Sequence, residues 1–273
     1  MPIGNQEFIQ LINSIQNYGP DYYVGMGNPD SEILLVGSEK ALNITQQPDI
    51  AIAEHELYQN HNHWRDILNN YHHPLINPFE PMLMERMAPL SGFNPFNPLL
   101  FTPTADRVMG KAGHTYYGMQ RLINAYQIQN GNPPLNIFNI AFEQNTFSKV
   151  FLTELSATPA SNQGVANFNL DQFLQSPRYN FLTHDTTYNF FSTFRTVVLY
   201  FGRNNTYAGN LGTEQRLQIA RIFNRNLSHL HGQVIAANNV EVYISDTCPR
   251  VVFCRHLSQG FSREAANAIV EYF

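Results

Sequence analysis

Cysteine is scarce in this chain of 273 residues, which contains only Cys248 and Cys254. Two cysteines are too few for a zinc site with four cysteine ligands or for an iron–sulfur cluster held by cysteines. We therefore expect neither a metal nor a cofactor, and free thiols rather than a disulfide. Free thiols are typical of the reducing cytoplasm, where we expect the protein to reside.

Long apolar runs, runs of like charge and Gly/Ser-rich tracts are also absent. A helix needs about 20 apolar residues to cross a bilayer, so we expect no membrane span. Because no tract resembles a linker between two halves, the sequence favours a single domain over 1–273.

Basic residues are few: 16 Lys and Arg stand against 21 Asp and Glu, which gives a formal net charge of -5. Nucleic-acid surfaces are usually basic because they contact phosphates, so this balance argues against a broadly basic surface. Local charge nevertheless affects binding. Four basic residues near the site predicted below form either a small patch on an acidic body or ordinary surface: Lys40, Lys111, Arg203 and Arg255.

Hydrophobic residues make up 43% of the chain, enough for a packed globular core. Short apolar runs bounded by turn signals are typical of buried strands, and four occur, at 32–36, 150–155, 196–201 and 251–254. Helical patterns, with Thr213 and Ser262 as expected N-caps, occur at 5–18, 49–70, 114–126, 169–175, 188–193, 213–226 and 262–273. This alternation predicts an α/β fold with three α/β/α layers and a central, mainly parallel sheet.

Other segments have weaker patterns. The runs at 136–142 and 240–244 are further strand candidates. Between about 72 and 104, many prolines and Asn-Pro steps exclude long regular elements, and we expect an ordered loop or lid. Histidines crowd 55–73 without the His-Glu-x-x-His spacing of a metal site, and Asn60-His61-Asn62-His63-Trp64 is expected to form a polar helix face.

Two loops that follow predicted strands are more than two hundred residues apart. Gly37-Ser38-Glu39-Lys40-Ala41 follows the run at 32–36, and Arg255-His256-Leu257-Ser258 follows the run at 251–254. The carboxyl ends of neighbouring parallel strands meet at one crevice in an open α/β sheet. We therefore expect Glu39, Glu154 and His256 to lie around one crevice.

These loops and three further segments occur in an order that resembles the uracil-DNA glycosylase superfamily. The further segments are Gly110-Lys111-Ala112-Gly113 at a helix start, the strand that ends at Glu154, and the strand that ends in Gly202-Arg203. The resemblance implies a divergent member without an iron–sulfur cluster, with the superfamily's α/β fold. It also implies DNA, or a nucleobase or nucleotide, as the partner, bound as a base extruded from the stack.

The resemblance assigns roles to these residues. Glu39 would orient a water or stabilise the sugar, and His256 would donate a hydrogen bond to a base oxygen. Glu154 stands where the superfamily has an asparagine that reads the base, and an ionised carboxylate only accepts hydrogen bonds. Glu154 therefore suits a base with N–H donors better than uracil. Other expected substrate-binding residues are Gly37, Ser38, Ser258, Tyr116 and Lys111, the two serines as holders of phosphates.

Three functions remain open from the sequence. The first is a DNA glycosylase that removes a damaged or mismatched base. The second is a catalytically silent member of the same fold that binds a nucleobase, a nucleotide or a protein. The third, a small-molecule hydrolase on a doubly wound sheet, is not supported by a Gly-x-Ser-x-Gly elbow or a Gly-rich phosphate loop.

Overall fold

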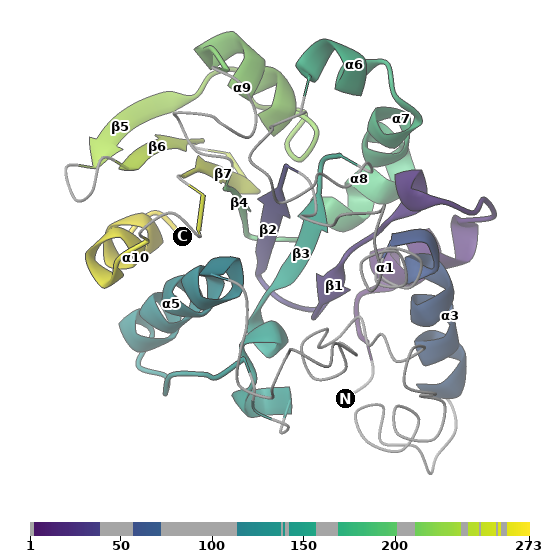
Figure 1. Cartoon of the computed structure of the whole chain (residues 1–273), viewed down its shortest axis with the longest axis horizontal. Helices are drawn as coiled ribbons and strands as arrows, with labels where there is room; N and C mark the ends of the chain where they lie inside the picture. Colours follow the sequence, from purple (N-terminus) through teal and green to yellow (C-terminus); the bar gives the residue numbers. More distant parts are fainter. Residues whose placement is uncertain are drawn as a thin grey trace.

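A single mixed sheet forms the centre of the structure, a computed structural model (Figure 1). It describes residues 3–38, 57–71, 114–137, 139, 142–156, 169–200, 211–235, 240–245, 247–254, 256–257 and 261–273. Within these ranges, seven strands are ordered β1-β3-β2-β4-β7-β6-β5. The strands are β1 (Met26–Gly27), β2 (Ile33–Gly37), β3 (Phe151–Glu154), β4 (Thr196–Leu199), β5 (His231–Ile235), β6 (Val240–Ile244) and β7 (Arg250–Phe253).

The four central strands, β3, β2, β4 and β7, are parallel, and they correspond to the four apolar runs of the sequence. Antiparallel strands flank them: β1 pairs with β3, and β6 pairs with β7 and with the edge strand β5. The candidate at 240–244 is confirmed as β6. A parallel core with antiparallel edges agrees with the predicted α/β class.

The predicted strand at 136–142 is wrong. Of its described residues, 136, 137 and 139 are irregular, and Phe142 begins the 3-10 helix η3 (Phe142–Gln144). The carboxamide of Asn145 donates to the carbonyls of Ile137 (3.2 Å) and Asn139 (2.6 Å). These side-chain bonds occupy acceptors that a strand would have used for a neighbouring strand.

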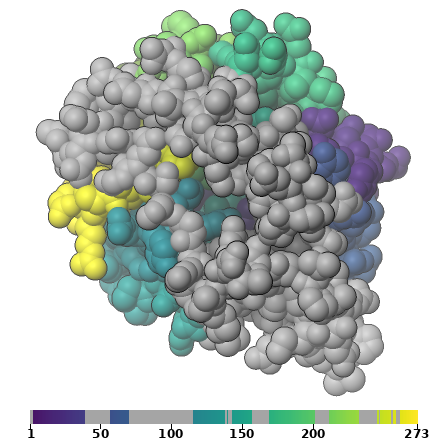
Figure 2. Space-filling view, in the orientation of Figure 1, coloured from purple at the N-terminus to yellow at the C-terminus, as the bar shows by residue number. Residues whose placement is uncertain are grey.

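Helices cover both faces of the sheet, as expected. Side chains alternate along a strand, so Leu34 and Val36 face one core while Ile33 and Leu35 face the other. The first core is covered by α1 (Gln6–Ser14), α3 (Asn60–Tyr71), α6 (Leu170–Leu174), α7 (Pro177–Thr183), α8 (Asp185–Phe191) and α9 (Thr213–Ala220). The second is covered by α5 (His114–Gln129) and α10 (Arg263–Val270), which lie side by side in Figure 2.

Within the described ranges, the helix predictions are correct except at some ends, and α7 is the one α-helix without a predicted counterpart. Residues 49–56 of the predicted helix at 49–70 lie outside the described residues. Ser262 caps α10, accepting from the Ala265 amide at 3.2 Å. Thr213 is not an N-cap: Gly212 holds that position, and Gln215 Oε1 accepts from its amide at 2.8 Å. This side-chain bond satisfies the backbone at the helix start without a hydroxyl.

The segment before β1 is held by a buried asparagine. Asn60 Oδ1 accepts from the amides of Val24 (3.0 Å) and Gly25 (3.2 Å), and its Nδ2 donates to the Gly25 carbonyl (2.9 Å). Trp64 Nε1 donates to the same carbonyl. Asn60, His61 and Trp64 are buried, so the expected polar helix face is wrong here. The buried N–H and C=O groups of Val24 and Gly25 thus find hydrogen-bond partners in side chains, because buried backbone groups need a partner.

The sequence predicted no membrane span and no disulfide. None of the helices among the described residues is long and apolar enough to cross a membrane. Cys248 is exposed and Cys254 is buried, and both are free, as expected. The segment at 72–104 lies outside the described residues.

We expect Asn60→Ala to lower the free energy of unfolding by about 3 kcal/mol, because it leaves buried backbone groups without partners. The matched variant Asn62→Ala removes bonds to the side chains of Gln59 and Arg65 at a part-exposed position and should cost less than about 1 kcal/mol. Urea unfolding of the full chain measures both. Equal losses would contradict the assigned role of Asn60.

Candidate functional site

A row of residues crosses the carboxyl ends of the four parallel strands. Glu154 lies opposite Gly37 in the β3–β2 register. The Tyr200 amide donates to Val36, and the Cys254 amide donates to Leu199, which extends the same register across β4 and β7. Because side chains alternate, Glu154, Tyr200 and Cys254 lie on the face covered by α5 and α10. Strand pairing therefore places them at one edge.

Gly37 leaves the space that its two neighbours in the row occupy. A Cβ atom there would overlap with Glu154 Oε2 and lie 2.8 Å from Tyr200 Oη. Glu154 is 7% exposed and Tyr200 is 4% exposed. The missing side chain therefore lets a carboxylate and a phenol converge beneath the surface.

His256 joins this group from the loop after β7. Its ring centroid lies 5.5 Å from that of Tyr200, with the ring planes inclined by 65°. Helix α5 touches the same loop, because a Cβ at Gly118 would overlap with the Leu257 carbonyl. Tyr116, in the first turn of α5, packs against the same core and acts electrostatically on Tyr200. Glu154, Tyr200, Tyr116 and His256 thus form one cluster.

Burial decides the protonation of the two titratable rings. Burial, then Glu154 and Tyr116, raise the pKa of Tyr200 well above its usual range, so its hydroxyl keeps its proton. Burial lowers the pKa of His256 to about 4, so its imidazole is neutral near pH 7. A protonated phenol and a neutral imidazole can each donate one hydrogen bond, whereas an ionised Glu154 would only accept.

A buried arginine lies behind the end of β3. Arg178 of α7 donates to the Glu154 carbonyl at 2.6 Å, to the Asp21 carbonyl at 3.0 Å and to the Tyr23 carbonyl. Burial lowers its pKa to about 10, although Tyr23, Asp21 and Glu154 oppose that shift, so Arg178 remains a cation at neutral pH. Arg178 therefore ties β3 to the segment before β1.

Five of the predicted site residues lie at this edge of the sheet. Glu154 lies beside Gly37, while His256 and Tyr116 are linked to this pair through Tyr200. Ser38 follows Gly37 directly and is buried, and its carbonyl accepts from the Ser156 amide at 2.7 Å. The others lie outside the described residues, as do the basic residues considered with them: Glu39, Lys111, Ser258, Lys40, Arg203 and Arg255.

Sequence reasoning missed Tyr200, Arg178 and Gly118 as parts of the site. Tyr200 had a signal, since it stands at the end of a predicted strand, as Glu154 does. Arg178 and Gly118 had none, because only the tertiary structure brings them to distant backbone. Among the described residues, no group of three His, Cys, Asp or Glu could hold a metal ion.

Comparison with protein-family models, curated proteins and solved structures finds no match to this chain. The fold and the cluster thus define an α/β protein with a polar site at the carboxyl ends of parallel strands. The superfamily resemblance remains a prediction from the sequence.

Gly37→Ala should lower the free energy of unfolding by about 2 kcal/mol or more, because the methyl group must displace Glu154 and Tyr200. At exposed Gly4 an added Cβ would meet no atom closer than 3.7 Å, so Gly4→Ala should change stability by less than about 0.5 kcal/mol. Urea unfolding compares the two. A neutral Gly37→Ala would show that the two polar groups do not converge there.

The low pKa of His256 predicts acid sensitivity. Between its usual value of about 6.5 and about 4, the unfolded chain binds a proton that the folded chain does not, so stability falls as pH falls. From pH 7.5 to 5 the loss should be about 2 kcal/mol. His256→Gln should remove that part of the loss, while the part due to His61, whose pKa burial also lowers, should remain. Urea unfolding of the parent and of His256→Gln at both pH values measures the loss of unfolding free energy. An equal loss in the two proteins would show that burial of His256 does not lower its pKa.

Proposed function

We propose that the chain is a DNA glycosylase-like protein of the uracil-DNA glycosylase superfamily that hydrolyses the N-glycosidic bond of a damaged or mismatched base. One observation carries the proposal. Glu154, Tyr200 and a neutral His256 cluster where the two loops that resemble the superfamily leave the parallel strands. Ligands bind at this edge in open α/β sheets.

Hydrolysis places opposite charges on the two halves of the substrate. As the bond from C1′ to the base nitrogen breaks, its electron pair goes to the base, and the sugar becomes cationic before water oxygen bonds to C1′. Neutral His256 and protonated Tyr200 are suited to donate hydrogen bonds to the developing negative charge. Glu39 is proposed to orient the water and accept its proton, with Ser38, Ser258 and Lys111 near the flanking phosphates.

The choice of base is proposed to depend on Glu154. In its ionised form this carboxylate can only accept, so it favours a base edge that presents N–H donors over plain uracil. An unmatched buried polar group costs about 1–3 kcal/mol, which corresponds to a preference of roughly tenfold to a hundredfold.

A silent relative that binds a nucleobase or nucleotide is the second candidate. The distribution of positive charge favours this candidate. In the described part of the site, the nearby cation Arg178 donates to backbone carbonyls, so it does not face a ligand. The net charge of -5 points the same way. Such a protein would bind the base through Glu154 and His256 without cleaving the bond.

Excision assays test the proposal on duplexes that contain uracil, hypoxanthine, xanthine or mismatched bases. The parent should excise a base with N–H donors and leave uracil largely intact. Glu39→Ala and His256→Ala should each lower the rate about 10²-fold or more, the usual effect of removing an acid–base or charge-stabilising group. Glu154→Asn should gain activity on uracil. His184→Gln, at an exposed histidine on another element, is the control and should keep the parental rate.

Two outcomes would overturn the proposal. Uracil removal by the parent that Glu39→Ala and His256→Ala leave unchanged would exclude both the site and its specificity. Retained base binding without excision from any duplex would establish the silent relative.

A further inference from the structure

Two exposed histidines meet at the edge of the sheet, at strand β5, two positions beyond β7 in the strand order. His229 Nε2 lies 2.9 Å from His231 Nε2, and the ring centroids are 4.4 Å apart with planes at 88°. Both histidines are exposed and the intervening Leu230 is buried, so both rings lie on the solvent side. The two rings thus approach each other through their Nε2 atoms.

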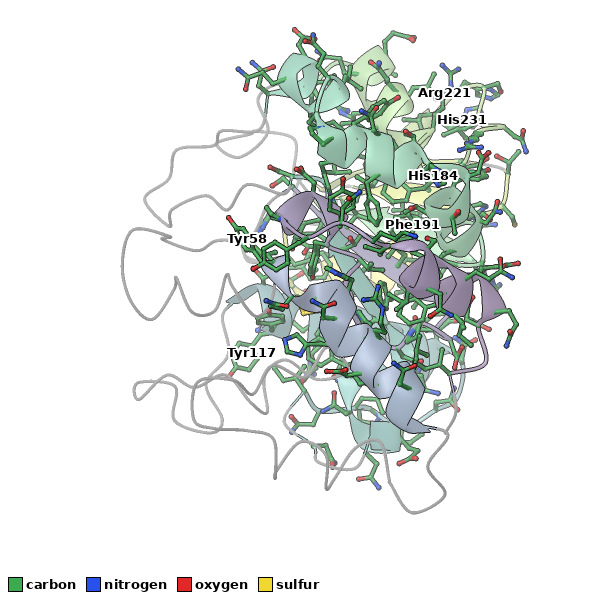
Figure 3. All side chains as sticks on the ribbon, turned by 90° about the vertical axis from the view of Figure 1, so that its right-hand side faces the viewer. Tyr58, Tyr117, His184, Phe191, Arg221 and His231 are labelled. Carbon is green, nitrogen blue, oxygen red and sulfur yellow. The ribbon has the colours of Figure 1, made fainter. Side chains whose placement is uncertain are left out.

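The position of this pair is open to solution. His231 begins β5, and among the described strands β5 pairs only with β6, so the pair stands at the outer edge of the described sheet (Figure 1). Figure 3 labels His231 at the rim of the molecule. An ion can therefore reach both nitrogens without a rearrangement of the core.

We propose that His229 and His231 bind one divalent copper ion through their Nε2 atoms, with water in its other positions. Two imidazole nitrogens about 2.0–2.1 Å from one ion are about 2.9 Å apart at a right angle and about 3.3 Å apart at a tetrahedral angle. The observed 2.9 Å matches the right angle. Right-angled nitrogen and oxygen ligands are typical of tetragonal Cu(II), which also binds such ligands more tightly than other first-row divalent ions.

Ser228 completes the arrangement around the first ligand. Its Oγ lies 2.7 Å from His229 Nδ1. For Nε2 to bind an ion, the imidazole proton must lie on Nδ1, where it can be donated to Ser228 Oγ. Partners of this kind fix the tautomer and orientation of a metal-binding histidine. In the absence of metal, one Nε2–H donates to the other ring.

Zinc is the weaker candidate at this position. Structural zinc takes four protein ligands, and the described residues contain no group of three possible metal ligands. Copper tolerates an exposed site with two histidines and waters, since its remaining positions need no protein ligand.

The test is a calorimetric titration of the full-length protein with Cu²⁺ at pH 7.5, with glycine as a weak competitor. The parent should show a saturable site for one ion. His229→Ala and His231→Ala should each raise its Kd about a hundredfold, because one ligand then binds without its partner, and Ser228→Ala should raise it about tenfold. His184→Ala is the control: this exposed histidine already accepts from the Thr186 amide, and its loss should leave the Kd unchanged.

Two further measurements complete the test. Electron paramagnetic resonance should show two equatorial nitrogens in the parent and fewer in each single variant, and Zn²⁺ should displace Cu²⁺ only in large excess. His229→Gln and His231→Gln provide second variants, with circular dichroism as the test of folding. An unchanged copper Kd in folded variants at both positions, or no saturable binding by the parent, would overturn the proposal.

Discussion

The in-register pairing of β3, β2, β4 and β7 is the constraint on which the candidate site depends. A slip of one residue would turn every side chain of a strand to the other face of the sheet. The register places Gly37 between Glu154 and Tyr200, and the absence of a side chain at Gly37 leaves the space that both polar side chains enter. The buried apolar residues earlier in each strand fix that register, so the core determines the chemistry at the edge.

Burial dominates the electrostatics of the cluster. At His256 burial is the cause of the lowered pKa, so the ring is neutral and donates as an imidazole, without a full positive charge. At Tyr200 burial and the Glu154 charge act in the same direction, so the hydroxyl keeps its proton. Enclosing a carboxylate costs several kcal/mol unless it is compensated. Arg178, buried behind the same strand end, supplies a positive charge within electrostatic reach of Glu154.

Sequence patterns predicted the parallel core because each central strand lies within a short, largely apolar run. The same patterns failed for strands that are very short or polar, and where a side chain binds backbone carbonyls that a strand would use. Strand β1 is two residues long and ends in glycine, β5 begins with three residues that are not hydrophobic, and Asn145 takes the carbonyls of the strand wrongly expected at 136–142. The positions of Glu154 and His256 were predictable because they lie near strand ends: Glu154 ends β3, and His256 lies three residues after the end of β7. Arg178 was not, since its carbonyl partners come from other elements.

Under the proposed function, the described cluster would contact a nucleobase and not the phosphate backbone. Neutral donors and a single acceptor recognise a base edge, and their strength depends little on salt, whereas phosphate contacts need cations and weaken steeply as salt rises. Arg178 is committed to backbone carbonyls, so it does not supply that charge. Under the same proposal, contacts to a DNA backbone would come from basic residues outside the described ranges, such as Lys40, Arg203 and Arg255. Base recognition would then depend on strand register, and backbone binding on the charge of those other residues.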